Sequence, residues 1–293
     1  MIDLSIIIMT RNNSRLLSEC ISSIISATKK ISYEIIVVDN ASTDGSVPMV
    51  KKDFPQVLLI QNKENMGFSK SNNLGLKKAN GRYSMLLNND TKIMDGAFDL
   101  LVDHMDKDPK AGAIGPMLLN TDMSAQRQGS ILGGRSRISG KPKEVDFIMG
   151  ACLMVRKEAI EQVGLMDENF VFYNDDLDWC KRIKKGGWKL VFYPNAKIVH
   201  YGGYSSGRTF NSMLFVEGFR GGLYYCKKHY IGPAYYIYRI LLPIALLMLA
   251  LLWTIAWPFS AGKIRMEYPI KLASLWEILK IDLSGNLKPP KTL

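Results

Sequence analysis

Apolar and polar positions alternate in the first part of the chain in blocks that predict strands followed by helices. Short apolar runs, each ending in polar residues, are typical of buried strands. The predicted strands are residues 4–9, 34–39, 56–61 and 83–87. Apolar residues at helical spacing predict helices over 16–27 and 69–79. This order predicts a mostly parallel sheet with helices on both faces, on which a ligand binds beyond the carboxyl ends of the strands.

The pattern is less regular in the second part of the chain, which begins near residue 115. Regular structure is predicted again over 147–156, 157–163, 179–185 and 190–199. The segment 124–143 is rich in glycine and serine and carries five basic residues and no acidic one. Its composition predicts a mobile loop rather than a core element.

The third part of the chain is markedly apolar. Residues 240–259 form an uncharged stretch of a length that can cross the ~30 Å hydrocarbon core of a membrane as a helix. Residues 272–283 place leucines and a tryptophan on one helical face, which predicts a helix in the membrane interface. A buried core helix is the alternative. A single crossing would put Lys263, Arg265 and Lys271 outside, against the positive-inside tendency, so a re-entrant or interfacial arrangement stays open.

Composition and charge narrow the class of protein. With 47% hydrophobic and 22% charged residues, the chain is not disordered. The formal net charge is +11 and points to an anionic partner, such as nucleic acid, membrane lipid or a phosphorylated small molecule. Residues 1–115 contribute only +1, against +6 from 116–230 and +4 from 231–293. A nucleic-acid-binding fold over the whole length is therefore disfavoured.

Carboxylates follow two of the predicted strands. Asp39 ends one buried strand; it can accept the ring N–H of uracil or thymine, or it can form an Asx turn. Asp90 follows another apolar run. A hard carboxylate there can hold Mg²⁺ or Mn²⁺, with waters and phosphate oxygens as the other ligands, or it can belong to a solvated turn.

A second group of polar residues lies further along the chain. Asp175, Asp176 and Asp178 stand among aromatic residues. Close like charges and apolar surroundings raise the pKa of a carboxyl group, which makes it a better base near neutral pH. The same residues also suit the cap of a helix N-terminus. His200 ends a predicted strand before a glycine-rich turn and is either structural or close to a phosphate or metal.

In this order, the motifs resemble those of the family 2 glycosyltransferases, which have the GT-A fold, and in particular the rhamnosyltransferase-like branch. The matching segments are Thr10-Arg11-Asn12, EIIVVDNASTDGS (34–46), ENMGFSKSNNLGLKKANGRYSMLLNND (64–90), DFIMGACLMVRKEAIEQVGLMDENFVFYNDDLDWCKRIKKGGW (146–188) and IVHYGGYSS (198–206). The resemblance implies an α/β GT-A fold with a Rossmann-like nucleotide-sugar-binding half and an acceptor-binding and catalytic-base half, and the apolar pattern adds C-terminal membrane-associated helices. The corresponding ranges are 1–115, 116–230 and 231–293.

The resemblance also implies roles for single residues on the donor side. The donor-nucleotide pocket would be lined by Thr10, Asn12, Asp39 and Ser42. Asp90 occupies the last position of the family's D-x-D-like motif and would coordinate the divalent metal, Mg²⁺ or Mn²⁺, through the diphosphate. Asn88 stands where many members of the wider GT-A group have aspartate, and His200 matches a position that approaches the metal or diphosphate.

On the acceptor side, the resemblance assigns the catalytic base. Asp176 matches the aspartate of the family's Glu-Asp motif, and Asp175 replaces the usual glutamate. Asp175 and Trp179 are expected to face the acceptor.

The implied activity is that of an inverting glycosyltransferase in cell-surface polysaccharide or cell-wall glycan assembly. It would move a sugar from a nucleoside-diphosphate donor to a hydroxyl of a saccharide or lipid-linked saccharide. Its expected location is the cell membrane, with the catalytic domain facing the cytoplasm and no nucleic-acid partner. The basic residues of 124–143 would meet anionic headgroups or the acceptor phosphate, or form a solvated loop.

Two other functions stay open. One is a transferase that loads a single sugar onto polyprenyl phosphate. The other is a non-catalytic, membrane-bound module that binds a sugar or nucleotide.

Overall fold

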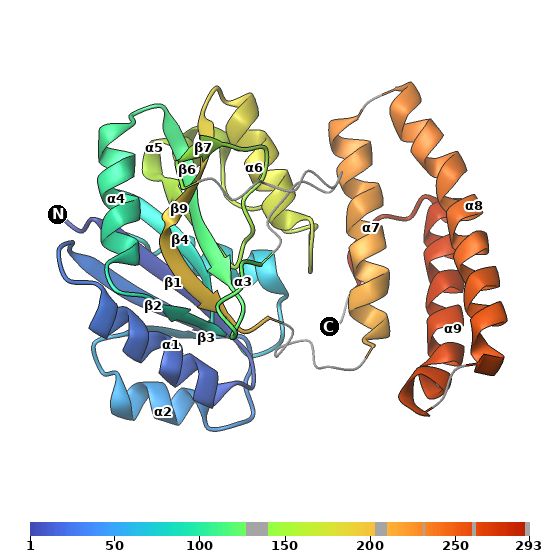
Figure 1. The fold of residues 1–293 in the computed structure, drawn as a ribbon, viewed down its shortest axis with the longest axis horizontal. Coiled ribbons are helices and arrows are strands. Elements are labelled where there is room, and N and C mark those ends of the chain that lie inside the picture. The colour runs from blue at the N-terminus through green and yellow to red at the C-terminus, as the bar shows by residue number, and fades with distance from the viewer. Residues whose placement is uncertain (127–139, 203–209, 231, 260–261, 291–293) are drawn as a thin grey trace. The chain divides into compact units, whose positions relative to one another are not determined.

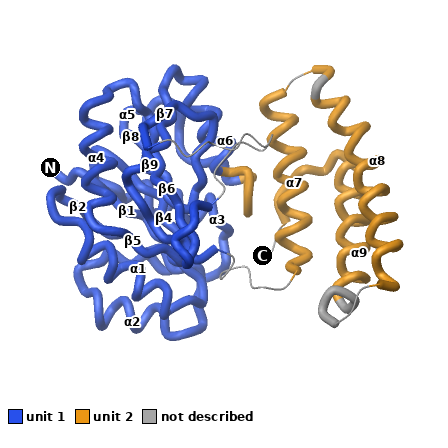
Figure 2. Tube along the Cα trace, in the orientation of Figure 1, with its two compact units in different colours: residues 1–168, 176–205, 292–293 blue, residues 169–175, 206–291 orange. Residues whose placement is uncertain are grey.

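The chain forms two compact units, which are described separately here (Figure 2). The computed structural model describes residues 1–126, 140–202, 210–230, 232–259 and 262–290. The first unit, here called the sheet unit, comprises residues 1–168, 176–205 and 292–293. The second, here called the helical unit, comprises residues 169–175 and 206–291.

A mixed sheet runs through the sheet unit (Figure 1). Its strands are β1 (Leu4–Thr10), β2 (Tyr33–Asp39), β3 (Leu58–Gln61), β4 (Tyr83–Asn88), β5 (Thr91–Ile93), β6 (Ala111–Leu119), β7 (Lys143–Glu144), β8 (Cys152–Arg156) and β9 (Lys189–His200). Their order is β3-β2-β1-β4-β8-β6-β9-β5, with β7 paired to β9. β3, β2, β1 and β4 pair in parallel, as predicted, whereas β8 is antiparallel to both of its neighbours.

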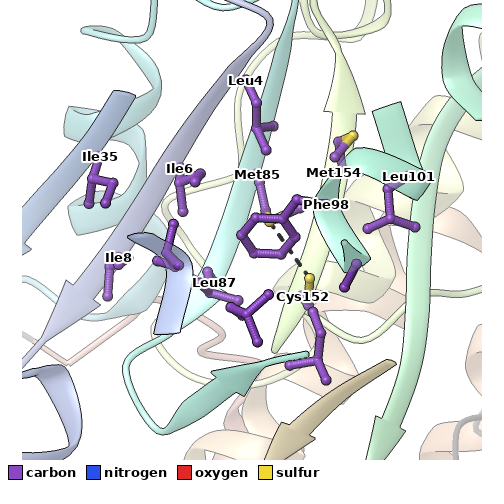
Figure 3. Packing of buried hydrophobic residues seen from close by; sticks show 14 of the residues in the cluster. Leu4, Ile6, Ile8, Ile35, Met85, Leu87, Phe98, Leu101, Cys152 and Met154 are labelled. Carbon is purple, nitrogen blue, oxygen red and sulfur yellow. Dashed lines mark hydrogen bonds between the residues drawn. The ribbon is translucent and has the colours of Figure 1, made fainter. Parts of the chain in front are cut away.

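Helices cover both faces of this sheet. They are α1 (Ser14–Ala27), α2 (Ser46–Asp53), α3 (Phe68–Leu76), α4 (Ala97–Lys107), α5 (Lys157–Val163) and α6 (Asp175–Lys185). Side chains alternate along β1, so that Ile6 and Ile8 join the cluster under α1, α2 and α4 while Ile7 joins the cluster under α3, α5 and α6. Figure 3 shows the first cluster, in which Phe98 of α4 lies among residues of β1, β4 and β8.

The predicted core elements of the sheet unit are confirmed, within a few residues at their ends. Five elements were not predicted: α2, α4, β5, β6 and β7. β6 is buried along its whole length, so it lacks the polar alternation that marks a half-exposed strand. It also passes through residue 115, so the two predicted halves of the fold share one sheet.

The predicted basic segment 124–143 lies mostly outside the described residues, and Arg127, Arg135 and Arg137 are among those outside. The prediction of a loop is wrong at Lys143. This residue begins β7, because its backbone pairs with Phe192 of β9.

The helical unit contains α7 (Ser212–His229), α8 (Pro233–Ala256), the short 3₁₀ helix η1 (Trp257–Phe259) and α9 (Gly262–Ser284). A cluster that includes Leu223, Leu246 and Ile278 joins α7, α8 and α9. Among the described residues, one helical stretch, Tyr235–Phe259, is long and apolar enough to cross a membrane by length and composition. Within the described residues, only 11% of its most apolar part is buried, and Ile240, Leu247 and Leu251 are each at least 60% exposed.

The short segment 169–175 belongs to the helical unit by its contacts. Arg220 of α7 is buried and donates hydrogen bonds to the carbonyl oxygens of Asn169 and Leu287 while it pairs with Glu217 at 2.8 Å. Asn174 donates a hydrogen bond to the Gly218 carbonyl at 2.9 Å. Asn174 and the preceding Tyr173 both have φ near +63°, a conformation that is unfavourable for the tyrosine and that such contacts help to maintain.

The close packing of α3 against the sheet gives a prediction about stability. A Cβ at Gly75 would lie 2.4 Å from Ile7 Cγ2, so we expect Gly75→Ala to lower the free energy of unfolding by about 1–3 kcal/mol through overpacking. Denaturant unfolding in detergent measures this. Gly45→Ala is the control, because a Cβ there meets nothing within 4 Å. Equal stability of the two variants would contradict the prediction.

Candidate functional site

The carboxyl ends of β1, β2 and β4 meet at one edge of the sheet. In the parallel register, Thr10 lies opposite Asp39 and Met9 lies opposite Asn88. Thr10 and Asp39 are both buried, and Asn89 Nδ2 donates a hydrogen bond to Thr10 Oγ1 at 2.8 Å. The register of β1 therefore brings the polar residues that follow three strands into one place.

The loops after β1 and β2 hold each other in position. The Asn12 backbone N–H donates to Ser42 Oγ at 3.0 Å, and Asn12 Oδ1 accepts from the Thr43 backbone N–H at 2.7 Å. Asn12 and Ala41 have φ values of 51° and 59°, in the left-handed region. Asparagine tolerates this region well, so at Asn12 the turn conformation has little cost. Thr10, Asn12, Asp39 and Ser42 thus lie together, as the predicted nucleotide pocket requires.

Asp39 has one oxygen held by the protein and one that is not. Its Oδ2 accepts a hydrogen bond from the Ser42 backbone N–H at 3.1 Å. Its Oδ1 is buried and has no hydrogen-bond partner in the part of the chain that the structure describes. Burying a carboxylate oxygen without a donor is unfavourable, and a bound ligand or an ordered water molecule is what supplies a donor to such an atom.

Asp90 lies beside His200 because β5 pairs with β9. Thr91 is opposite His200 in this antiparallel pair, and the Tyr201 backbone N–H donates to the Asp90 carbonyl at 2.9 Å. Asp90 Oδ1 lies 3.4 Å from His200 Nε2. This buried oxygen also has no hydrogen-bond partner among the residues described.

Asp90 and His200 suit a divalent cation that takes most of its ligands from outside the protein. A carboxylate oxygen and an imidazole nitrogen suit Mn²⁺, and the carboxylate alone suits Mg²⁺. Within the described residues there is no group of three or more His, Cys, Asp or Glu that could hold a metal ion. A cation here would therefore take its remaining ligands from water and from phosphate oxygens of a bound molecule.

Asp176, the predicted base, lies at the start of α6. Its Oδ2 accepts from the Gly150 backbone N–H and its Oδ1 from the Leu177 backbone N–H, both at 2.8 Å. Burial raises the pKa of this carboxyl group, and the two hydrogen bonds oppose the rise. Gly150 permits this close approach, since a Cβ there would lie 3.3 Å from Asp176 Cβ.

One short loop links Asp176 to the end of β4. Gly150 donates to Asp176, and the carbonyl of the next residue, Ala151, accepts from the Asn88 backbone N–H at 3.0 Å. Asn88 in turn places its side-chain Nδ2 3.3 Å from His200 Nε2. A chain of contacts therefore connects the base to the Asp90–His200 pair within the sheet unit.

The other two predicted acceptor-side residues are buried. Asp175 is 4% exposed, and Trp179 has no exposed surface. The Trp179 indole N–H donates to the Gly164 carbonyl at 3.0 Å, and its ring packs in the cluster under α3, α5 and α6. The structure gives Trp179 a packing role, and its contact with an acceptor stays a prediction. Asp178, also buried, pairs with Arg182 at 2.8 Å.

Sequence reasoning missed three residues of this site. Asn89 follows a predicted strand, and the polar run Asn88-Asn89-Asp90 was a usable signal for it, whereas Gly150 lies inside the predicted segment 147–156. Gln126 contacts His200 from a segment without any such signal. Its contact depends on residues 74 positions apart in the sequence, which only the folded chain brings together.

Comparison with known proteins identifies relatives of this chain. Residues 5–164 match the model of glycosyl transferase family 2, and residues 85–276 match that of glycosyl transferase family group 2. The chain is 26% identical over 240 residues to an N-acetylglucosaminyl-diphospho-decaprenol L-rhamnosyltransferase of Mycobacterium tuberculosis. This match covers 70% of the chain and 78% of the relative.

Two solved structures show that the fold is of the GT-A type. A mannosyltransferase from Pyrobaculum calidifontis in complex with GDP-Man and Mn²⁺ superposes with a TM-score of 0.62 at 15% identity, over 97% of this chain and 87% of that one. GalNAc-T7 with UDP, GalNAc and Mn²⁺ superposes with a TM-score of 0.65 at 17% identity, over 99% and 59%.

The surroundings of Asp176 predict its titration. We expect its carboxyl group to titrate above the usual 3.8, because burial outweighs the two backbone hydrogen bonds. Carboxyl ¹³C NMR between pH 3 and pH 8 measures this, with Asp176→Asn to assign the signal. A midpoint at or below 3.8 would show that the hydrogen bonds dominate.

Proposed function

The chain belongs to glycosyl transferase family 2, and on that premise we propose that this glycosyltransferase moves a sugar, with inversion, from a nucleoside-diphosphate donor to a lipid-linked saccharide. The observation that carries the proposal is the pair of buried carboxylate oxygens, Asp39 Oδ1 and Asp90 Oδ1, at one edge of the sheet. Neither has a hydrogen-bond partner among the described residues. One can accept an N–H donor and the other can bind a cation, and a nucleoside diphosphate with its metal supplies both.

The donor nucleoside lies against the loops after β1 and β2 in this proposal. Asp39 Oδ1 accepts the ring N–H of the base, while its Oδ2 stays bound to the Ser42 backbone. Asn12 fixes the neighbouring loop through its hydrogen bonds with Ser42 and Thr43. Thr10, held by Asn89, forms the floor of the pocket.

The diphosphate lies at Asp90 and His200, which would hold the divalent metal. When bound, the metal supplies positive charge that stabilises the departing diphosphate. The Mn²⁺ complexes of the two GT-A neighbours support this part of the proposal. The near-neutral charge of residues 1–115 also supports it, because that part of the chain offers little bulk positive charge for the diphosphate.

Asp176 is the general base in the proposed mechanism. It removes the proton of the acceptor hydroxyl as that oxygen attacks the anomeric carbon from the side opposite the diphosphate. The bond between the anomeric carbon and the diphosphate oxygen breaks, and the configuration inverts. The Gly150 and Leu177 backbone N–H groups hold the carboxylate in one orientation, and its raised pKa brings its basicity closer to neutral pH.

The acceptor assignment rests on the helical unit and on one relative. The Mycobacterium tuberculosis relative acts on an N-acetylglucosaminyl-diphospho-decaprenol, a saccharide linked to a lipid. In this chain, Tyr235–Phe259 presents a largely unburied apolar surface, with Ile240, Leu247 and Leu251 each at least 60% exposed. Such a surface suits a membrane that also carries the acceptor. We place the protein at the cell membrane, in cell-surface glycan assembly, with the catalytic side facing the cytoplasm.

Loss of the base tests the proposed reaction. We expect Asp176→Asn to lower sugar transfer by about 10²–10⁴-fold, because an amide cannot take the hydroxyl proton, while nucleotide binding is kept. Mass spectrometry of the products, with a panel of nucleotide sugars, measures transfer to a lipid-diphosphate-linked saccharide, a free saccharide and polyprenyl phosphate.

Asp53→Asn is the matched control, because Asp53 is exposed at the end of α2. A fully active Asp176→Asn variant would overturn the assignment of the base. Transfer to polyprenyl phosphate alone would overturn the acceptor, and no turnover of any donor by the wild type would favour a binding module.

Loss of Asp90 tests the metal. We expect Asp90→Asn to weaken Mn²⁺-dependent binding of UDP or dTDP by more than about tenfold, because it removes the anionic ligand. Calorimetry with and without Mn²⁺ measures this, and binding without metal is expected to change little. Equal Mn²⁺ dependence in the variant and the wild type would contradict the role of Asp90.

A further inference from the structure

His200 and Gln126 are joined by two reciprocal hydrogen bonds. Gln126 Nε2 donates to the His200 carbonyl oxygen at 2.6 Å, and Gln126 Oε1 lies 3.0 Å from His200 Nδ1. The Gln126 backbone N–H donates to the Leu118 carbonyl at 2.9 Å, which anchors the residue to the end of β6. Gln126 is half-buried and His200 is buried, so water competes little for these bonds.

This pair of bonds determines the orientation of the glutamine amide. A carbonyl oxygen accepts and never donates, so the Gln126 group that faces the His200 carbonyl must be the NH₂ group. The amide oxygen then faces His200 Nδ1. An amide oxygen is only an acceptor, so Nδ1 must carry the hydrogen atom.

The tautomer has a consequence at the other ring nitrogen. In a neutral imidazole with its hydrogen on Nδ1, Nε2 has a free lone pair, which is the form that binds a metal. His200 Nε2 lies 3.4 Å from Asp90 Oδ1 and 3.3 Å from Asn88 Nδ2. The Asn88 amide can donate to a lone pair, whereas it would oppose a hydrogen on Nε2. Two electron-pair donors, Nε2 and Asp90 Oδ1, therefore face each other without a hydrogen bond between them.

We propose that Gln126 is a positioning residue that sets the Nδ1–H tautomer of His200 and so prepares Nε2 as a metal ligand beside Asp90. This inference rests on the divalent metal of the proposed function. Gln126 itself touches neither metal nor substrate in this scheme. Its effect passes through one imidazole ring, in the way that outer-shell partners orient the histidine ligands of metals.

The tautomer can be read in the metal-free protein. With ¹⁵N-histidine labelling at pH 8, the wild type is expected to show a protonated Nδ1 and an unprotonated Nε2 for His200. The chain has three histidines, and His200→Asn identifies the signals that belong to this one. Gln126→Met removes the acceptor at Nδ1, and its His200 signals are expected to shift towards the Nε2–H form.

Metal affinity is the second measurement. We expect Gln126→Met to weaken Mn²⁺ binding by about 10–100-fold in the presence of UDP or dTDP, as loss of such partners typically does. Gln126→Glu keeps an oxygen at Nδ1 but loses the hydrogen bond to the His200 carbonyl, and it is expected to stay close to the wild type. Gln56→Met is the control, since Gln56 is exposed next to β3. Circular dichroism verifies folding.

Where the wild type binds Mn²⁺, three results would overturn the proposal: an Nε2–H tautomer in the wild type, wild-type Mn²⁺ affinity in Gln126→Met, or equal loss of affinity in Gln126→Glu and Gln126→Met. The last would mean that the glutamine only clamps the His200 backbone. If the wild type binds no Mn²⁺, this inference fails, whereas sugar transfer and its dependence on Asp176 decide separately whether the proposed function fails.

Discussion

The parallel register of β1 between β2 and β4 is the constraint on which the site depends. It places Thr10 opposite Asp39 and Met9 opposite Asn88, so that three strands end at the same edge. A slip of one residue would turn Ile7 towards the opposite face and move every polar end group with it. The two apolar clusters that hold β1 from both faces make such a slip very unfavourable. The packing of the core therefore fixes the geometry of the chemistry.

Local hydrogen bonds, rather than a concentration of charge, organise the edge of the sheet. Asp39, Asp90 and Asp176 are held by backbone N–H groups or by strand pairing, and none of them is bonded to a lysine or arginine in the described residues. A carboxylate oxygen that is not neutralised by a basic side chain stays available for a ligand. That none of the three aspartates is bonded to a lysine or arginine in the described residues agrees with the low net charge of residues 1–115. The excess of basic residues lies in the rest of the chain.

Much of the fold could be predicted from the sequence, because buried strands and amphipathic helices leave a periodic pattern. The strand ends at Asp39, Asp90 and His200 followed from that pattern, and the roles assigned to them came from the family resemblance. β5 has only three residues and is too short to show a period. The contacts of Gly150 with Asp176 and of Gln126 with His200 join distant segments. Sequence patterns over a few residues do not indicate such long-range contacts, although these contacts orient the predicted residues.

The contacts of segment 169–175 bear on how this enzyme can be shortened. Its backbone and the side chain of Asn174 are held by Arg220 and Gly218 of α7, and Asp176 follows directly in the chain. A deletion from α7 onward would remove the apolar helix, but it would also release Tyr173 and Asn174, the two residues with positive φ that precede Asp175 and the base. Truncation would thus gain solubility but would disturb the conformation of the residues that precede α6. Detergents or lipid nanodiscs that keep the helical unit are the better route to an active preparation.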